Sequence, residues 1–138
     1  MKQFLLVLAL ALAFSSIAFA QKNTNEVSLK TISKIFETYI SQDENIDTKD
    51  NKDAMQAALQ SLKKVSDKKS LTLLIDVWMY YDPTDFPTRR LVEPVLYKDR
   101  PASIAAIEER LKNKKKWEKE GTAPYADLAA FKKAIVAP

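Results

Sequence analysis

Apolar residues recur three and four positions apart along most of this chain, which is the spacing of one face of an α-helix. This spacing predicts helices over residues 28–41, 53–65, 70–81, 88–98, 101–111 and 124–136. Residues 73–81 are also rich in strand formers, but no partner strand or hairpin turn lies near them, so a helix is the better interpretation. The polar residues 21–27 are expected to be frayed. The pattern therefore predicts an all-α protein of about six helices.

Proline and aspartate mark the expected helix ends. Asp82-Pro83 should end the third helix, because the residue before a proline is displaced from the α region. Asp99 is expected to cap the fifth helix, with Pro101 in its first turn. Pro94 falls inside the fourth predicted helix. There it must either lie in the first turn of a helix that starts late or kink the helix.

The connection after the first predicted helix is polar and rich in Asp and Asn. Its Asp-x-Asn-x-Asp start at residues 43–47 resembles a calcium loop, but an EF-hand needs Gly at the sixth position and Glu at the twelfth. Those positions hold Thr48 and Ala54, so the match fails. A solvated loop is the better interpretation, with Asp50 or Asn51 capping the next helix.

Residues 1–20 have the features of a secretory signal peptide. Lys2 precedes an uninterrupted apolar run from Phe4 to Phe14, and Ala18-Phe19-Ala20 is a small-x-small cleavage motif. The apolar run is short against the roughly 20 residues of a membrane span. The segment therefore predicts cleavage after Ala20, export to the periplasm or the outside, and a single helical-repeat domain over 21–138. No second segment of the mature chain is expected to span a membrane.

The composition excludes several kinds of chemistry. The chain has no Cys and no His, which excludes disulfides, zinc sites built on those residues, and nucleophiles that need an imidazole base. Its one glycine, Gly121, excludes glycine-rich phosphate loops. We expect no cofactor and no metal. Residues 21–138 carry a net charge of +3, which is weaker than that of a dedicated nucleic-acid binder, so no specific nucleic acid is expected.

The starts of the third and fifth predicted helices match each other. Ser-Leu-x-x-Leu at residues 70–74 recurs as Ser-Ile-x-x-Ile at residues 103–107, each shortly after an Asp and a basic residue. Paired helices over 28–65, 70–98 and 103–136 are of the size of solenoid repeats. Such hairpins bury their apolar faces by stacking on one another.

On these residues the chain resembles a HEAT-type helical repeat. The motif consists of residues 73–77, the turn Asp82-Pro83, Arg89, and Leu91-Val92. The resemblance implies three stacked antiparallel hairpins and a surface that binds another protein. It also implies a clasp across the turn between Asp82 or Asp85 and Arg89 or Arg90. An unrelated six-helix bundle fits the periodicity as well.

Two groups of residues are candidates for a binding surface. The first is a basic segment formed by Lys112, Lys114, Lys115, Lys116, Lys119 and the aromatic Trp117. It either binds a polyanion, with Trp117 stacking on a ligand ring, or is a solvated helix end whose Trp117 folds back onto the core. The second group is Tyr80 and Phe86, which would form a binding patch if they were exposed and otherwise pack in the core.

Carboxylates are the remaining candidates for acid–base chemistry. The candidates are Asp76, Asp82, Asp85, Glu93, Glu108 and Glu109. A hydrolase needs two of them at a fixed separation, which spacing along the chain does not indicate. The sequence therefore favours an exported, non-enzymatic module that binds another protein. Polyanion binding through residues 112–119 is the alternative, and a small carboxylate-dependent hydrolase is the least favoured hypothesis.

Overall fold

The described residues of the protein form a bundle of six helices. The computed structural model describes residues 2–41, 48–118 and 124–138, with side chains from residue 22 onward. The helices are α1 (Lys2–Ser41), α2 (Lys49–Ser61), α3 (Lys68–Tyr80), α4 (Thr88–Tyr97), α5 (Arg100–Lys112) and α6 (Pro124–Val136). The described residues contain no β-strand, so the predicted all-α class is confirmed.

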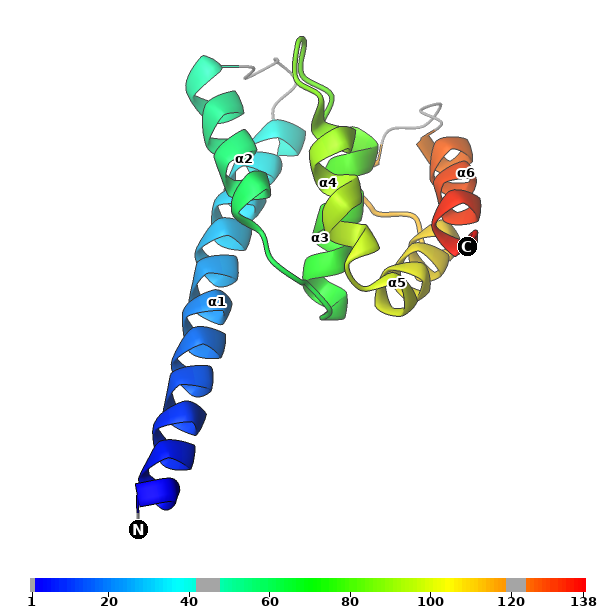
Figure 1. The fold of residues 1–138 in the computed structure, drawn as a ribbon. Coiled ribbons are helices and arrows are strands. Elements are labelled where there is room, and N and C mark those ends of the chain that lie inside the picture. Colours follow the sequence, from blue (N-terminus) through cyan, green and yellow to red (C-terminus); the bar gives the residue numbers. More distant parts are fainter. Residues whose placement is uncertain (1, 42–47, 119–123) are drawn as a thin grey trace.

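Consecutive helices pack in pairs, α1 with α2, α3 with α4 and α5 with α6 (Figure 1). The pairs are joined mainly through α3, which also contacts α1, α5 and α6, while α2 contacts α4. Figure 1 shows α1 extending well beyond the other helices at its N-terminal end. The body of the molecule is therefore built on the C-terminal half of α1.

A single hydrophobic core joins all six helices. Each helix contributes a side chain with no more than 1% of its surface exposed, namely Ile32, Leu59, Leu74, Val92, Ile107 and Leu128. Trp78 of α3 is also buried, and its ring stacks on Phe131 of α6 with centroids 5.3 Å apart. The predicted inward positions Leu74, Trp78 and Ile107 are thus confirmed as core positions.

Aspartate caps begin two of the helices that the sequence predicts. Asp67 Oδ1 accepts a hydrogen bond from Ser70 N at 2.9 Å, and Asp99 Oδ1 accepts one from Ala102 N at 3.3 Å. Each bond satisfies a backbone donor that the first helical turn leaves without a partner. The predicted cap at Asp99 is confirmed. The helix after Asp67 begins at Lys68, two residues before its predicted start.

The beginning of α2 differs from the prediction. The helix begins at Lys49 and its cap is Thr48, whose side chain accepts from Asn51 N at 3.2 Å. The prediction of a cap at Asp50 or Asn51 is therefore wrong, because both residues already lie in the first turn. Positions 43–47 of the rejected calcium motif lie outside the described residues.

Two further boundaries differ from the prediction. Residues 21–27 are helical rather than frayed, since α1 is continuous through them and contains neither Pro nor Gly to interrupt it. In contrast, α2 ends at Ser61, so Lys63 lies in an extended linker and not in the last helical turn. Pro94 lies inside α4, in its second turn.

The buried positions of α3 and α5 correspond at an offset of 32 residues, counted from the two aspartate caps. At that offset four pairs of positions are all buried: Leu71 with Ser103, Leu74 with Ala106, Ile75 with Ile107, and Trp78 with Arg110. The sequence alignment at 33 residues instead placed the half-buried Ile104 opposite Leu71. Counted from the caps, a buried arginine on α5 therefore corresponds to a buried tryptophan on α3.

Candidate binding groove and the Arg110 cluster

An open groove of about 1440 Å³ runs along the body of the molecule between α1 and the helices α3 and α5. One wall is a strip of α1 that consists of Lys22, Asn25, Glu26, Leu29, Lys30, Ser33, Phe36, Glu37 and Ile40. The other wall combines residues 63–70, Thr72 and Leu73 with Asp76, Glu109, Arg110, Asn113, Lys115 and Trp117.

The residues of this α1 strip recur three and four positions apart, so they lie along one face of the helix. It begins at Lys22 and ends at Ile40. At 1.5 Å per residue, this stretch of helix is about 27 Å long. The groove therefore offers a partner a continuous helical face of five turns.

The linker between α2 and α3 closes one end of this groove, and α1 holds it there. Asn25 Oδ1 accepts a hydrogen bond from Lys63 N at 2.9 Å, and Asn25 Nδ2 donates to Lys64 O at 3.1 Å. Close by, the hydroxyls of Ser28 and Ser61 are 2.6 Å apart. An extended linker has no helical partners for its backbone polar groups, and one asparagine supplies both a donor and an acceptor.

The linker is also attached to the turn between α4 and α5. Lys98 Nζ donates to Leu62 O at 3.0 Å, and Ser66 Oγ donates to Asp99 Oδ2 at 2.6 Å. The Ser66 hydroxyl, followed by the Ala102 amide, lowers the pKa of Asp99. The linker is thus fixed on both sides, and with it the lysines that it carries.

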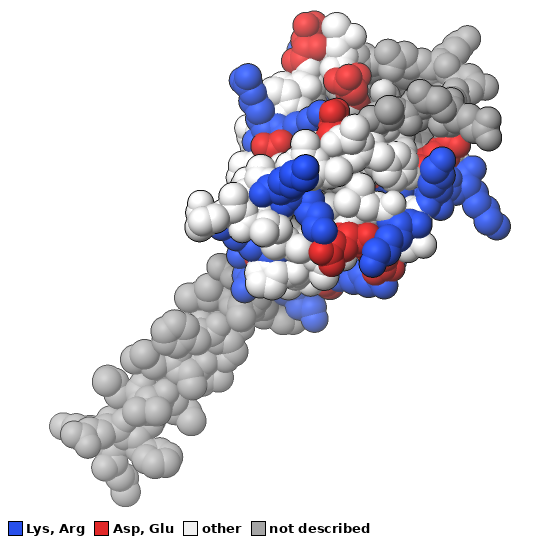
Figure 2. Space-filling view, turned by 90° about the vertical axis from the view of Figure 1, so that its right-hand side faces the viewer, with Lys and Arg blue, Asp and Glu red and all other residues white. Residues whose placement is uncertain are grey.

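Basic side chains outnumber acidic ones around the groove. The lining contains Lys22, Lys30, Lys63, Lys64, Lys68, Lys69, Lys115 and Arg110 against Glu26, Glu37, Asp67, Asp76 and Glu109. This excess of three equals the net charge of residues 21–138, so the remainder of that segment sums to zero. On the side of α5 and α6, Figure 2 shows Lys and Arg interspersed with Asp and Glu. The groove lining therefore carries an excess of basic side chains, two of which have acidic partners outside the lining, Lys64 with Asp99 and Arg110 with Glu118.

Apolar side chains lie between the charged ones. Leu29, Ile40 and Leu73 line the groove and are half-buried. Trp117 completes this surface, with its ring edge-on to Phe36 at 5.8 Å between centroids. The groove thus combines an apolar floor with a basic rim.

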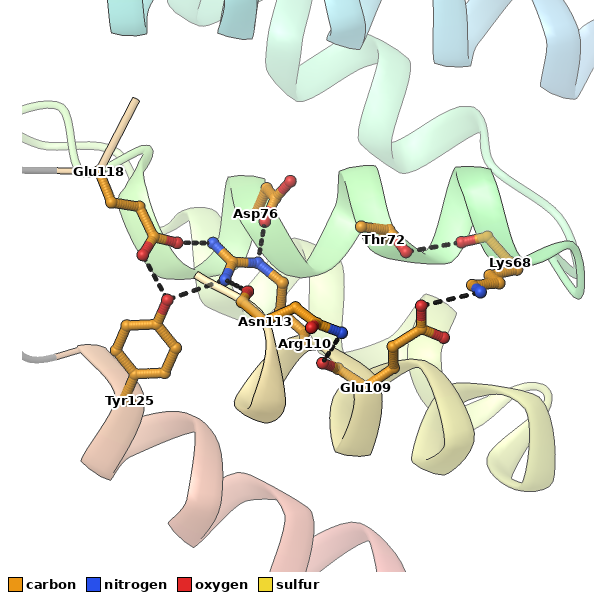
Figure 3. Close-up of polar contacts among 8 residues, drawn as sticks. All are labelled: Lys68, Thr72, Asp76, Glu109, Arg110, Asn113, Glu118 and Tyr125. Carbon is orange, nitrogen blue, oxygen red and sulfur yellow. Dashed lines mark hydrogen bonds and ion pairs between the residues drawn. The ribbon is translucent and has the colours of Figure 1, made fainter. Parts of the chain in front are cut away.

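A buried arginine fixes the end of the groove next to Trp117. The Arg110 side chain is 1% exposed, and its Nε donates to Asp76 Oδ1 at 2.6 Å. Nη1 donates to Asn113 O at 2.8 Å and to Tyr125 Oη at 2.9 Å, while Nη2 donates to Glu118 (Figure 3). The Tyr125 hydroxyl in turn donates to Glu118. We call these five residues the Arg110 cluster.

The two carboxylates of the Arg110 cluster have opposite pKa shifts. Burial raises the pKa of Asp76 by more than the Arg110 guanidinium lowers it. Burial also acts to raise the pKa of Glu118, but hydrogen bonds from Tyr125 and Arg110 bring it below its ordinary value. Burial opposes the charge of Arg110 too, yet its bonds to Asp76 and Glu118 raise the arginine pKa further. Asp76 is therefore the less well stabilised anion of the two.

The Arg110 cluster connects α3, α5, α6 and the segment 113–118. A buried network whose members all have partners is rigid, because removing any one partner leaves the others without compensation. It holds segment 113–118 in place and, with it, Lys115 and Trp117 at the groove. Beside it, the Tyr80 hydroxyl is buried and makes no hydrogen bond within the described residues.

The predicted basic segment is divided by the structure. Lys115 and Trp117 line the groove, whereas Lys112, Lys114 and Lys116 are exposed outside its lining. Trp117 packs against the core, as the structural interpretation of this segment expected. Lys112 lies in the last turn of α5, where a cation suits the helix dipole. Lys119 lies outside the described residues.

The two candidate aromatic residues do not form an exposed patch. Phe86 is buried, with its ring edge-on to Tyr81 at 5.8 Å between centroids. Tyr80 is half-buried, with its ring edge-on to Trp117 at 5.0 Å. Both side chains therefore belong to the packing that supports the groove.

The predicted clasp across the turn is wrong for Arg89. Its guanidinium lies 4.0 Å from the centroid of the Trp78 ring, Nε donates to Trp78 O at 3.2 Å, and Nη1 pairs with Asp127 of α6 at 2.9 Å. Arg89 faces α3 and α6 because it lies one residue into α4, beyond the turn. The other three predicted partners, Asp82, Asp85 and Arg90, are exposed.

Four of the candidate carboxylates have hydrogen-bonding or ionic partners. Asp76 belongs to the Arg110 cluster, and Glu93 accepts from Trp78 Nε1 at 3.0 Å. Glu108 pairs with Lys132 and Glu109 with Lys68, each at 2.8 Å.

Sequence reasoning missed Arg110 as a structural residue. Its signal is visible in hindsight: Arg110 follows Ser103 and Ile107 at the helical spacing of the buried face of α5. A basic residue at such a position indicates a buried partner.

Comparisons of the chain with protein-family models, with curated proteins and with solved structures give no match. Within the described ranges, no group of three or more acidic side chains could hold a metal ion. No helix in the same part of the chain is long and apolar enough to cross a bilayer. Function therefore has to be inferred from the groove and the Arg110 cluster.

Proposed function

We propose that the protein is an exported, non-enzymatic helical-repeat module that binds a segment of another protein in the groove between α1 and α3. The observation that carries this proposal is the continuous α1 strip from Lys22 to Ile40, which faces a fixed second wall. Small-molecule sites measure roughly 300–1,000 Å³ and enclose their ligand. A groove of about 1440 Å³ that is open along its length is better suited to a polypeptide segment.

The polar groups of the groove support binding rather than catalysis. Asp76 is bound to Arg110, and Glu109 pairs with Lys68 across the gap between α3 and α5 (Figure 3). These are ion pairs within the second wall, where they join α3 to α5. A hydrolase would instead need two carboxylates that flank a substrate at a fixed separation.

A tyrosine placed in the groove tests the proposal. Ser33 of α1 lines the groove, and S33Y would fill part of it. Ala130 is exposed on α6, outside the groove lining, so A130Y adds the same side chain at a control position. Peptides selected from a displayed library on the wild-type protein should bind A130Y as they bind wild type and bind S33Y at least about tenfold more weakly, through lost contact area. Equal binding to both variants would contradict the proposal.

Polyanion binding remains the second candidate, favoured by the exposure of Lys112, Lys114 and Lys116. A K112E/K114E/K116E variant distinguishes the two functions, because all three lysines lie outside the groove lining. Salt-dependent retention of the wild type on a polyanion column, lost in this variant, would favour the polyanion. Peptide binding that survives in the same variant would favour the groove.

The proposed export has a direct test. If residues 1–20 are a signal peptide, the protein recovered from the cell envelope or the medium should begin at Gln21. N-terminal sequencing checks this. A protein recovered from the cytoplasm with Met1 or Lys2 in place would contradict export.

A further inference from the structure

We propose that the partner segment is an acidic amphipathic α-helix, about five turns long, whose apolar face lies on the floor of the groove. This inference rests on the proposed function and identifies the chemistry of the occupant. The geometry of the α1 strip and the charge of the rim carry it.

The shape of the groove favours a helix. Its first wall is a helical face, and helices pack on one another by fitting ridges of side chains into grooves. The half-buried Leu29, Ile40 and Leu73 offer apolar contacts along it. A partner helix with apolar residues at positions i, i+3, i+4 and i+7 would meet them in register. A partner added as a β-strand would need the free edge of a β-sheet, and the described residues contain no strand.

The charge of the groove selects an acidic helix. The basic excess comes from the second wall, where Lys64 and Lys69 are among six basic residues against three acidic ones, whereas Lys22 and Lys30 of α1 are balanced by Glu26 and Glu37. A helix whose apolar stripe is flanked by Glu or Asp would place one row of carboxylates at the lysines of the second wall and the other beside Lys22 and Lys30. Complementary charge of this kind raises the association rate and fixes the register.

The same charge argues against a second copy of this chain as the occupant. Charged residues counted along the sequence give α2 a net charge of zero, and each of the other five helices is net positive. None of them is net negative, and docking one of the five net-positive helices in the groove would place like charges together. The partner is therefore a different protein.

A set of matched peptides tests the inference on the purified protein. All would be 18 residues long, with leucine at the same i, i+3, i+4 and i+7 positions. The first has glutamate on both flanks of the leucine stripe, the second has glutamine there, and the third is the glutamate peptide with two central prolines. The glutamate peptide should bind about tenfold tighter than the glutamine peptide at low salt, since exposed charge pairs are individually modest but add. This advantage should shrink at high salt.

Charge-reversal variants test whether the preference for the glutamate peptide arises in the groove. K30E/K69E removes one lysine from each wall, and K114E/K133E makes the same change of charge outside the groove lining. The preference for glutamate over glutamine should disappear in K30E/K69E and persist in K114E/K133E. A preference lost equally in both variants would overturn the inference, because it would reflect net charge alone.

The outcomes separate this inference from the proposed function. If glutamate and glutamine peptides bind equally and S33Y still abolishes binding, the groove stands and the acidic partner is wrong. If the proline peptide binds as well as the helical one, the helix is wrong. Binding of vesicles containing phosphatidylglycerol that S33Y abolishes would overturn the inference in favour of a lipid surface. If no peptide binds, the proposed function fails as well.

Discussion

At the scale of single residues, the Arg110 cluster holds two anions on one cation, and they are not equivalent. The raised pKa of Asp76 means that the fold favours its neutral form, whereas the lowered pKa of Glu118 means that the fold favours its charged form. At pH 7, D76N removes an ionic partner of the same buried guanidinium, but it should lower the free energy of unfolding by less than E118Q does. E118Q should lower it by about 1–3 kcal/mol, because a buried guanidinium loses an ionic acceptor. Urea unfolding measures both.

The raised pKa of Asp76 also predicts how the stability of the protein changes with pH. A raised folded-state pKa contributes stability that is present below the unfolded-state value and is lost as the pH rises through the folded-state value. The wild type should therefore gain stability relative to D76N as the pH falls from 7 toward 4. A constant difference between the two proteins, or a cost of D76N at pH 7 as large as that of E118Q, would contradict this account.

Asp85 is the non-glycine residue that has a positive φ within the described part of the chain. Its φ of 67° lies in the left-handed region, in the turn between α3 and α4. D85G should keep or raise the free energy of unfolding, whereas D85V should lower it by about 1–2 kcal/mol, because a β-branched residue is disfavoured there. Asp53, inside α2, is the control, since glycine should be the more costly substitution in a helix. The same order of valine and glycine at both sites would show that the backbone of Asp85 is not responsible.

At the scale of elements, the hydrophobic pattern predicted most of the helices well. Both ends of α6 are as predicted, from Pro124 to Val136, and α4 begins at Thr88 as expected after Pro87. The errors lie where local signals compete. Asp50 and Asn51 are good capping residues, but Thr48 precedes them and caps a helix that begins earlier. The apolar pattern of α2 continues past Ser61 in the sequence, so the predicted helix included Lys63. In the structure the backbone is already extended after Ser61.

The Asn25 contact between α1 and the α2–α3 linker is the most specific link between elements. N25A removes the hydrogen bond that Lys63 N donates to Asn25 Oδ1 and the one that Asn25 Nδ2 donates to Lys64 O. It should therefore lower the free energy of unfolding by about 1–2 kcal/mol. The amide of Lys63 should also exchange faster with solvent. Urea unfolding and hydrogen exchange check the two effects.

Two further variants sharpen the test of Asn25. N25D keeps an acceptor for the Lys63 amide but sets a second carboxylate oxygen against the Lys64 carbonyl, so it should be no better than N25A. Asn23 is exposed on the same helix, and N23A should have no effect. An N25A protein with unchanged stability and exchange would show that the linker is held by other contacts.

At the scale of the whole molecule, the sequence indicated the kind of surface but not its place. The basic segment 112–119 was recognised as a concentration of charge, yet only Lys115 and Trp117 of it reach the groove among the described residues. The strip of α1 and the linker lysines come together only through folding. The spacing of apolar residues within one helix predicts which side of that helix is apolar. A groove depends on how two helices are placed relative to each other, which this spacing does not determine.

The contacts of the body begin late in α1, which makes a prediction about processing. Ser28 is the first buried residue among those whose side chains are described, and Asn25 makes its contacts just before it. A chain of residues 21–138 should therefore fold, with a helical circular-dichroism spectrum and one cooperative urea transition, since a single core joins all six helices. A chain of residues 28–138 should be less stable by about 1–2 kcal/mol, as N25A is, because it lacks the same two hydrogen bonds. Failure of 21–138 to fold would mean that residues 1–20 are part of the structure and would remove the support for a cleaved signal.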